Sequence, residues 1–442
     1  MKPQLSALLV LVLFPLAAYG QSGSINNTLG TGGTFTVKDG TTTFLSLGQS
    51  DGYLDVAQSL RLPLTTSSGL GVIFKGADRF IHNYTASGTD GCNTFVGVNA
   101  GNFTMSGGGI QASYNTSVGE NSLMSITSGY RNSAFGYYAL FSNTTGSHND
   151  AFGFYALSSN ISGGSNSAFG SDALHSNTTG SSNAAFGSTT LYSNTTGSSN
   201  SAFGRNALYS NTTGTYDAAF GYQALFTNTT GYSNSAFGYY ALRSNTGNRN
   251  SALGDSAGYN LTSGSNNTLI GYKAMPSSAT ISNEITLGNS SVTSLRCQVT
   301  TITALSDARD KRNIKDLPLG LEFLMNVKPR LFSWDQRDWY ENGKPDGSKM
   351  QPTPSAGFIA QELEEVQRSA DAEWLGLVLK SNQDRLEATP GNLLPIMVKA
   401  IQDLKHENDQ LRDEVRALNK RNERVAELEK LVLALDAKLA SK

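Results

Sequence analysis

The chain has 442 residues, of which only 15% are charged, and its formal net charge at pH 7 is −2. This balance lacks the basic surface that nucleic-acid binding requires, and the length predicts several structural units. Glycine is abundant at 46 residues, proline is scarce at 11, and two cysteines are too few for a disulfide framework.

Residues 1–20 have the pattern of a secretory signal peptide, with a lysine at position 2 and an apolar stretch from Leu5 to Ala18 before Gly20. The stretch is shorter than the roughly 20 apolar residues that a membrane-spanning helix needs. We therefore expect a secreted or cell-surface protein with no membrane span once the signal is removed. Residues 21–92 alternate apolar and polar residues in short runs, which predicts a β-rich N-terminal cap.

A phenylalanine–glycine pair recurs every 17 residues between Phe135 and Phe237, and each copy reads roughly N-S-A-F-G-x-x-A-L-x-S-N-T-T-G. A fixed period of this size predicts a solenoid, because one copy is too small to bury its own apolar face and must stack on others. Degenerate copies extend the array over residues 93–275, and residues 276–305 are predicted to form a neck. The spacing slips to 16 residues before Leu253 and to 22 near the start, where atypical copies belong.

Each recurring position has a predicted role in stacked parallel β-structure. The phenylalanines form an apolar column, and the asparagines four residues before each glycine hydrogen-bond to the copies above and below. Glycine permits the positive φ of a corner, and pairs such as Ala139-Leu140 supply a second apolar edge. The Asn-Thr-Thr-Gly segment is predicted to be an outer turn. The sequons at Asn143, Asn177, Asn194, Asn211 and Asn228 could accept glycans in a eukaryotic protein. Turn chemistry alone explains them, so we do not predict glycosylation.

The array resembles the head repeats of trimeric surface adhesins and bacterial fibre proteins, in which three chains form a parallel β-roll or β-prism. A single-chain left-handed β-helix is the alternative architecture. Four aspartates between Arg131 and Met275 fall at four different phases of the repeat, so no carboxylate pair converges for glycan cleavage. Calcium-binding repeats carry an aspartate in every copy, which this array lacks. We predict no metal and no cofactor, and a fibre that is structural or binds an unidentified surface glycan or protein by shape.

Two cysteines, Cys92 and Cys297, flank the array. A bridge between them would require the two ends of a long fibre to meet. We therefore expect both to be buried free thiols.

Composition changes sharply near Ser306, where charge density rises, helix formers appear and the Asn-Thr-Thr-Gly turns vanish. Lys311 follows five positions later, and Ser–Lys dyads are convergent variants of the serine-protease machinery. A lysine acts as general base when burial or cationic neighbours keep it neutral. Two neighbouring arginines favour that state here, and two neighbouring aspartates oppose it.

The segments S-D-A-R-D-K-R-N-I and G-F-I-A-Q-E-L-E-E-V, followed by a C-terminal coiled coil, resemble the S74 peptidase family over residues 304–410. Members are intramolecular chaperone domains of phage endosialidases and tail fibres, and they also occur in secreted bacterial fibre proteins and animal myelin regulatory factors. The resemblance implies a domain that trimerises, drives folding of the preceding fibre and then cuts itself off. It assigns Ser306 as nucleophile, Lys311 as general base and Leu305–Ser306 as the scissile bond. Asn313 also matches the motif, and we assign it no catalytic role.

Residues 306–393 are predicted to form a small α/β module. Its helices are expected near 319–327 and 360–367, and its strands near 330–334, 357–359, 375–380 and 385–388. We expect its core to contain the large aromatic residues Phe323, Phe332, Trp334, Phe358 and Trp374.

Residues 394–442 are predicted to form a coiled coil. Apolar a and d positions follow alternating steps of four and three from Met397 to Val425, and a three-residue stammer precedes Leu428. Asn408 and Asn422 fall at a positions, where a buried asparagine fixes register.

The leading hypothesis is a secreted homotrimeric fibre precursor that self-cleaves once, as a serine endopeptidase with no other substrate. The alternative is a non-cleaving trimeric surface adhesin that retains the C-terminal module. A phage tail enzyme is disfavoured by the signal peptide and by the lack of paired carboxylates in the array.

Overall fold

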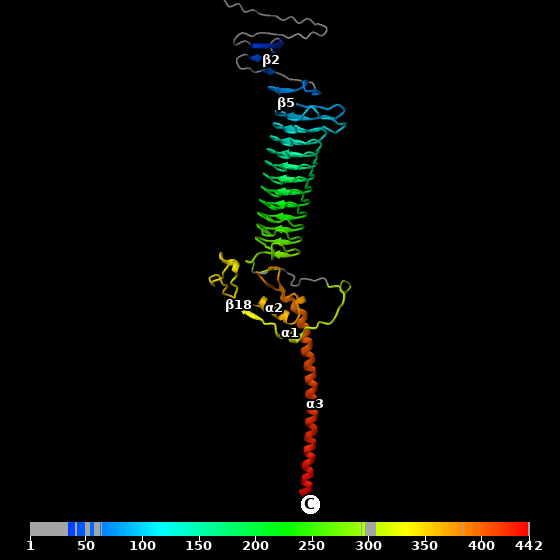
Figure 1. The fold of residues 1–442 in the computed structure, drawn as a ribbon, viewed down its shortest axis with the longest axis vertical. Helices are drawn as coiled ribbons and strands as arrows, with labels where there is room; N and C mark the ends of the chain where they lie inside the picture. Colours follow the sequence, from blue (N-terminus) through cyan, green and yellow to red (C-terminus); the bar gives the residue numbers. More distant parts are fainter. Residues whose placement is uncertain are drawn as a thin grey trace, which may run out of the picture.

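The structure is a computed structural model that describes residues 34–39, 42–48, 54–56, 62, 64–292, 294–296, 306–382 and 384–440. Figure 1 shows an elongated molecule in which a tall stack of short strands leads to a small mixed module and then to one long helix. The proposed signal peptide, Cys297 and Leu305 lie outside the described residues.

The N-terminal region is β-structure, as expected. Strands β1 (Thr34–Asp39), β2 (Thr42–Gly48) and β3 (Leu54–Val56) form an antiparallel sheet. Strands β4 (Ile73–Lys75) and β5 (Asp78–His82) pair antiparallel with each other and join the first strand of the repeat array.

The repeat array is a parallel β-solenoid in which a single chain closes every coil. Consecutive coils pair in register, so that Phe169, for example, lies between Phe152 and Phe186. The last strand continues the stack into the segment that we predicted as a neck. The parallel strands are β6 (Thr94–Val96), β7 (Thr116–Val118), β8 (Ser133–Phe135), β9 (Asp150–Phe152), β10 (Ser167–Phe169), β11 (Ala184–Phe186), β12 (Ser201–Phe203), β13 (Ala218–Phe220), β14 (Ser235–Phe237), β15 (Ser251–Leu253), β16 (Thr268–Ile270) and β17 (Ile285–Leu287).

The core of the regular 17-residue coils is made mainly of small side chains and one leucine, whereas the first coil buries Phe95. Ala134, Ala139 and Leu140 are fully buried, and their counterparts repeat along the stack. Side chains alternate along a strand, so the phenylalanine beside the inward alanine lies on the outer face, where it is half-buried. The predicted phenylalanine column is confirmed: from Phe135 to Phe237, successive rings stack with centroids 4.7–4.8 Å apart.

Glycine is required at the corner after each strand because of its backbone geometry and its neighbours. Gly136 has a φ of 141°, and a Cβ built on it would lie 2.3 Å from the carbonyl oxygen of Gly153. No side chain fits this contact, so consecutive coils can stack closely only with glycine here.

Two ladders of buried asparagines hold the coils together. In the predicted ladder, Asn149 Nδ2 donates to Asn132 Oδ1 at 3.2 Å and to Gly163 O at 2.9 Å. A second ladder was not predicted: Asn177 Nδ2 donates to Asn160 Oδ1 at 2.7 Å. The second ladder uses the asparagine of the Asn-Thr-Thr-Gly segment, so our interpretation of that asparagine as part of an outer turn is wrong. All five predicted sequon asparagines are fully buried, because only the coil interior offers their amides partners in the next coil.

Replacing Asn177 by alanine should lower the free energy of unfolding by about 1–3 kcal/mol, because Asn160 Oδ1 loses its donor inside the coil. Thr179, which is exposed two residues away, provides the control: Thr179→Ala should change stability by less than about 0.5 kcal/mol. Urea unfolding followed by far-UV circular dichroism measures both, and equal values would contradict a stabilising role for the second ladder.

Cys92 is a free thiol, but it is exposed, so the prediction that it is buried is wrong. It directly precedes the buried ladder residue Asn93 and has a φ of 57°. Arg131 and His148 hold the same place before their own ladder asparagines, with φ of 54° and 60°, and are also exposed. The ladder asparagine faces inward, and its predecessor is therefore turned towards solvent.

The C-terminal module contains the predicted elements, with β19 two residues earlier than expected. Phe323, Leu363 and Ile396 form part of its core, whereas Trp334 and Trp374 are exposed, so their assignment to the core is wrong. Trp334 packs edge-on against Phe332, with ring centroids 5.2 Å apart, and this contact leaves it 45% exposed. The elements of the module are η1 (Ala308–Asp310), α1 (Leu321–Met325), β18 (Arg330–Phe332), η2 (Arg337–Trp339), β19 (Ser355–Gly357), α2 (Ala360–Ser369), η3 (Glu373–Leu375), β20 (Val378–Leu379), β21 (Glu387–Ala388) and η4 (Pro390–Leu393).

Helix α3 (Leu394–Ala440) is a single 47-residue helix. Its first turns pack on the module through Ile396 and Ala400, and beyond them it extends alone, away from the solenoid (Figure 1). The predicted seam is uncovered in one chain, and Leu411 and Leu418 are each 60% exposed. Among the helices that the structure describes, none is both long enough and apolar enough to cross a membrane.

Candidate functional site

The structure brings the two predicted catalytic side chains together. Lys311 Nζ lies 2.5 Å from Ser306 Oγ and donates a hydrogen bond to it. The helix η1 between them supplies this geometry: Asp307 caps it by accepting from the backbone N–H of Arg309 at 2.9 Å. The single helical turn brings position 311 back beside position 306, at a distance suited to proton transfer.

Of the charged residues around this pair, Asp307 is neutralised by an ion pair with Arg309. The Arg309 guanidinium donates to Asp307 Oδ2 at 2.6 Å, and its side-chain and backbone donors hold the pKa of Asp307 below its ordinary value. Arg312 Nη1 donates to the carbonyl oxygens of Arg309 and Lys311 at 2.9 and 3.0 Å. Hydrogen bonds from Arg309 and Arg312 thus hold the backbone of this segment in place. The side chains of Ser306 and Lys311 are exposed to solvent in the single chain.

Asn313 has a structural role that sequence reasoning missed. Its φ is 54°, in the left-handed region that asparagine tolerates better than most residues. It turns the chain at the end of the segment that carries Ser306 and Lys311. The motif match was the only signal at this position, and it did not reveal a backbone role.

The module meets the end of the solenoid at the last coil. Glu284 occupies the next ladder position after Asn267, and its backbone N–H donates to Asn267 Oδ1 at 3.0 Å. Its carboxylate accepts from the backbone N–H of Ser277 at 2.8 Å, and Ser381 of the module donates to Ser277 Oγ at 2.9 Å. A cavity of about 1440 Å³ lies between the last coil and the module. The module thus sits against the C-terminal end of the fibre, as Figure 1 also shows.

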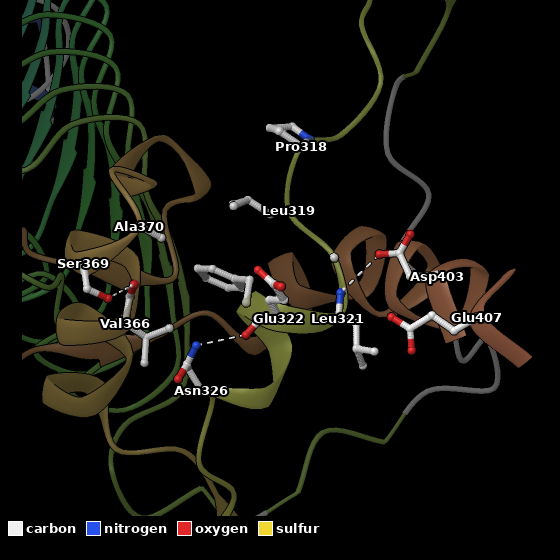
Figure 2. Close-up of a pocket in the computed structure, with 12 residues that line it drawn as sticks. Pro318, Leu319, Leu321, Glu322, Asn326, Val366, Ser369, Ala370, Asp403 and Glu407 are labelled. Carbon is white, nitrogen blue, oxygen red and sulfur yellow. Dashed lines mark hydrogen bonds between the residues drawn. The ribbon is translucent and has the colours of Figure 1, made fainter. Parts of the chain in front are cut away.

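A second cavity, of about 490 Å³, lies between α1, the end of α2 and α3 (Figure 2). Its acids include Asp403, which accepts from the backbone N–H of Leu321 at 3.3 Å and pairs with Lys399. The Lys399 ammonium holds the pKa of this carboxylate below its ordinary value. Neither Ser306 nor Lys311 lines the cavity. Its contacts hold α1 on α3, and we assign no chemistry to it.

The comparisons with known proteins identify this region. No curated protein and no solved structure matches the chain. The model of one family, described as Chaperone of endosialidase, matches residues 306–372. The match begins at Ser306 itself and includes Lys311, α1 and α2. A segment similar to the S74 chaperone domain therefore lies C-terminal to the β-solenoid.

Proposed function

We propose that the chain is the precursor of a secreted homotrimeric fibre, whose C-terminal module assembles three chains and then releases itself by cleavage between Leu305 and Ser306. The observation that carries this proposal is the 2.5 Å contact between Lys311 Nζ and Ser306 Oγ at the first residue of the family match. The position of the module against the last coil of the solenoid supports a role in starting fibre folding from that end.

The proposed reaction uses only the chain and water. Neutral Lys311 takes the proton from Ser306 Oγ, and the oxygen adds to the carbonyl carbon of Leu305. The peptide C–N bond then breaks as Lys311 returns the proton to the Ser306 nitrogen, leaving Leu305 as an ester on Ser306 Oγ. Water hydrolyses the ester to give a Leu305 carboxylate and a free Ser306 hydroxyl, and each chain reacts once.

Assembly provides a physical trigger for this reaction. Burial favours the neutral amine that a general base needs, and the Lys311 side chain is exposed in a single chain. The α3 seam is also uncovered in one chain and is apolar enough to join copies in parallel. We propose that trimerisation buries Lys311, so that cleavage follows assembly.

The repeats explain why such a module is useful. A slip of one whole coil between neighbouring chains would preserve most contacts, because the coils are nearly identical. A clamp that fixes the C-terminal end removes this degeneracy. Once the fibre has folded, its stacked coils maintain the register without the clamp.

Mass spectrometry of the mature protein tests the proposal. We expect one fragment that ends at Leu305 and a second that begins at Ser306. An intact chain in a preparation that sedimentation shows to be trimeric would overturn the cleavage and leave the assembly standing. A monomeric chain would overturn the assembly.

A further inference from the structure

One outward position of the solenoid is apolar in every coil. The third residue of each parallel strand lies on the outer face and aligns with its counterparts in register. We call this row the Phe stripe. It consists of Val96, Val118, Phe135, Phe152, Phe169, Phe186, Phe203, Phe220, Phe237, Leu253, Ile270 and Leu287.

Packing within one chain does not require this uniformity. The core is already complete without the stripe, because it is formed by the inward alanines and leucines. The position after the corner glycine also faces solvent, and it is Phe154 in one coil, Ser188 two coils later and Arg205 in the coil after that. Rings stack at that position only in some coils, as between Tyr137 and Phe154. A solenoid of this kind therefore tolerates polar residues on its outer face, and the stripe has none.

The residues beside the stripe suit close packing against another surface. The first residue of each strand shares the outer face, and it is serine, threonine or alanine in all but two of the parallel strands. The exceptions are Asp150 and Ile285. On this face of the parallel strands, the column of rings lies beside a row of small side chains. Among the first and third residues of these strands, Asp150 is the one that carries a charge. The centres of protein interfaces are likewise depleted of charged residues.

The direction of α3 indicates what covers this face. Helix α3 continues along the long axis of the solenoid (Figure 1), and its seam is exposed at Leu404, Leu411 and Leu418. Copies joined in parallel along that seam share one rotation axis, which runs in the same direction as the solenoid. Around a cyclic axis every copy turns the same face towards the axis. Leu253 and Leu287 are 56% and 53% exposed, so the stripe stays apolar and exposed up to the end of the solenoid that faces the module.

We propose that the Phe stripe is the face by which copies of this solenoid pack against one another, with the stripes meeting along the common axis. This inference rests on the proposed assembly and adds which of the solenoid's faces is internal. The remaining outer faces, including the aromatic surface of Tyr239 and Tyr259, stay open to solvent.

Site-specific labelling of the full chain tests the proposal. The background carries Ser306→Ala, Cys92→Ser and Cys297→Ser, and one new cysteine is added as Phe186→Cys. We expect a short bifunctional maleimide to link two copies of this variant, and a bulky single maleimide to react at least 10-fold more slowly than with an open thiol. The matched control is Thr179→Cys, which lies in the preceding turn at an exposed position away from the stripe.

The outcomes separate this inference from the proposed function. If the chain sediments as an oligomer but Phe186→Cys reacts as fast as Thr179→Cys and gives no linked dimer, the stripe is an open surface for another ligand and the inference fails. A monomeric chain defeats the proposed assembly and the inference together. Phe203→Cys, one coil away, repeats the test if the first variant does not fold.

Discussion

Ser306→Ala is expected to leave the chain at its full length, while the wild-type protein is found as two fragments. The substitution removes the only oxygen that the proposed mechanism can use as nucleophile, and it does not disturb the capped turn of η1. Loss of a nucleophile typically slows such reactions by a factor of ~10³ or more. A time course on denaturing gels, with intact-mass measurement, provides the readout.

Lys311→Gln should block the cut as completely, because the amide cannot take the proton from Ser306. Arg312→Gln is the matched control: it removes a neighbouring cation whose contacts are to backbone carbonyls. Its cleavage should be slower, because one cation that favours neutral Lys311 is lost, but it should go to completion. Both variants should sediment like the wild-type precursor. Cleavage of Ser306→Ala at the wild-type rate would overturn the assignment of Ser306 as the nucleophile. Cleavage of Lys311→Gln at the wild-type rate would overturn the assignment of Lys311 as the base.

A single buried acid should make the solenoid less stable as the pH rises. Asp217 replaces an asparagine of the first ladder and is 1% exposed. Its carboxylate accepts from the Asn234 backbone N–H at 2.8 Å and from Asn228 Nδ2 at 3.0 Å. The Asp217 backbone N–H donates to Asn200 Oδ1 at 3.0 Å, but the ionised side chain cannot add the second donor that an asparagine amide supplies at this position. Within the described residues, Asn228 Oδ1 has no partner. Burial raises the pKa of Asp217 to about 7.

The stability of the solenoid should fall with rising pH because the folded and unfolded states release the Asp217 proton at different pH values. The folded state holds the proton up to about pH 7, whereas the unfolded chain releases it near 3.8, so the stabilisation is full below about pH 4 and is lost as the pH rises to about 7. The difference corresponds to about 4 kcal/mol. Asp217→Asn should remove this dependence, because the amide can donate to its neighbours at every pH, as Asn183 does to Asn166 Oδ1 at 3.1 Å.

The measurement compares Asp217→Asn with its parent, both in the Ser306→Ala chain, by urea unfolding from pH 4 to pH 8. The comparison is needed because buried His82 acts in the opposite direction. Its pKa is lowered to about 4 by desolvation, so its contribution is present above about pH 6.5 and lost as the pH falls to 4. Both chains contain His82, and the difference between them isolates Asp217. A difference that does not change with pH would contradict the prediction.

Much of the fibre could be predicted from periodicity alone. The 17-residue spacing predicted stacked coils, the phenylalanine column and one asparagine ladder, because each needs the same residue at the same phase of every copy. The second ladder could not be predicted in this way. Asn143 and its counterparts lie in a segment whose composition is typical of turns, and only the closed coil shows that the amide faces inward.

For the candidate site, the motif predicted the pair Ser306 and Lys311, and the structure supplied the turn that joins them. The motif includes Asn313 but does not predict its role in turning the chain, because the left-handed φ of this residue is a property of the folded backbone. Size and hydrophobicity predict that Trp334 and Trp374 are core residues, but both are exposed. Neither property says on which side of the module a side chain lies.

The sequence by itself therefore determined the repeat, the boundary near Ser306, the heptad seam and the residues that could do chemistry, because all of these are patterns along the chain. The tertiary structure alone decided which side of each coil faces inward. It showed that the phenylalanine column lies on the outer face and that the sequon asparagines are buried. The reason is physical: small and aliphatic side chains and the ladder asparagines fill the interior of a 17-residue coil, and the alternation of side chains along each strand turns the neighbouring rings outward.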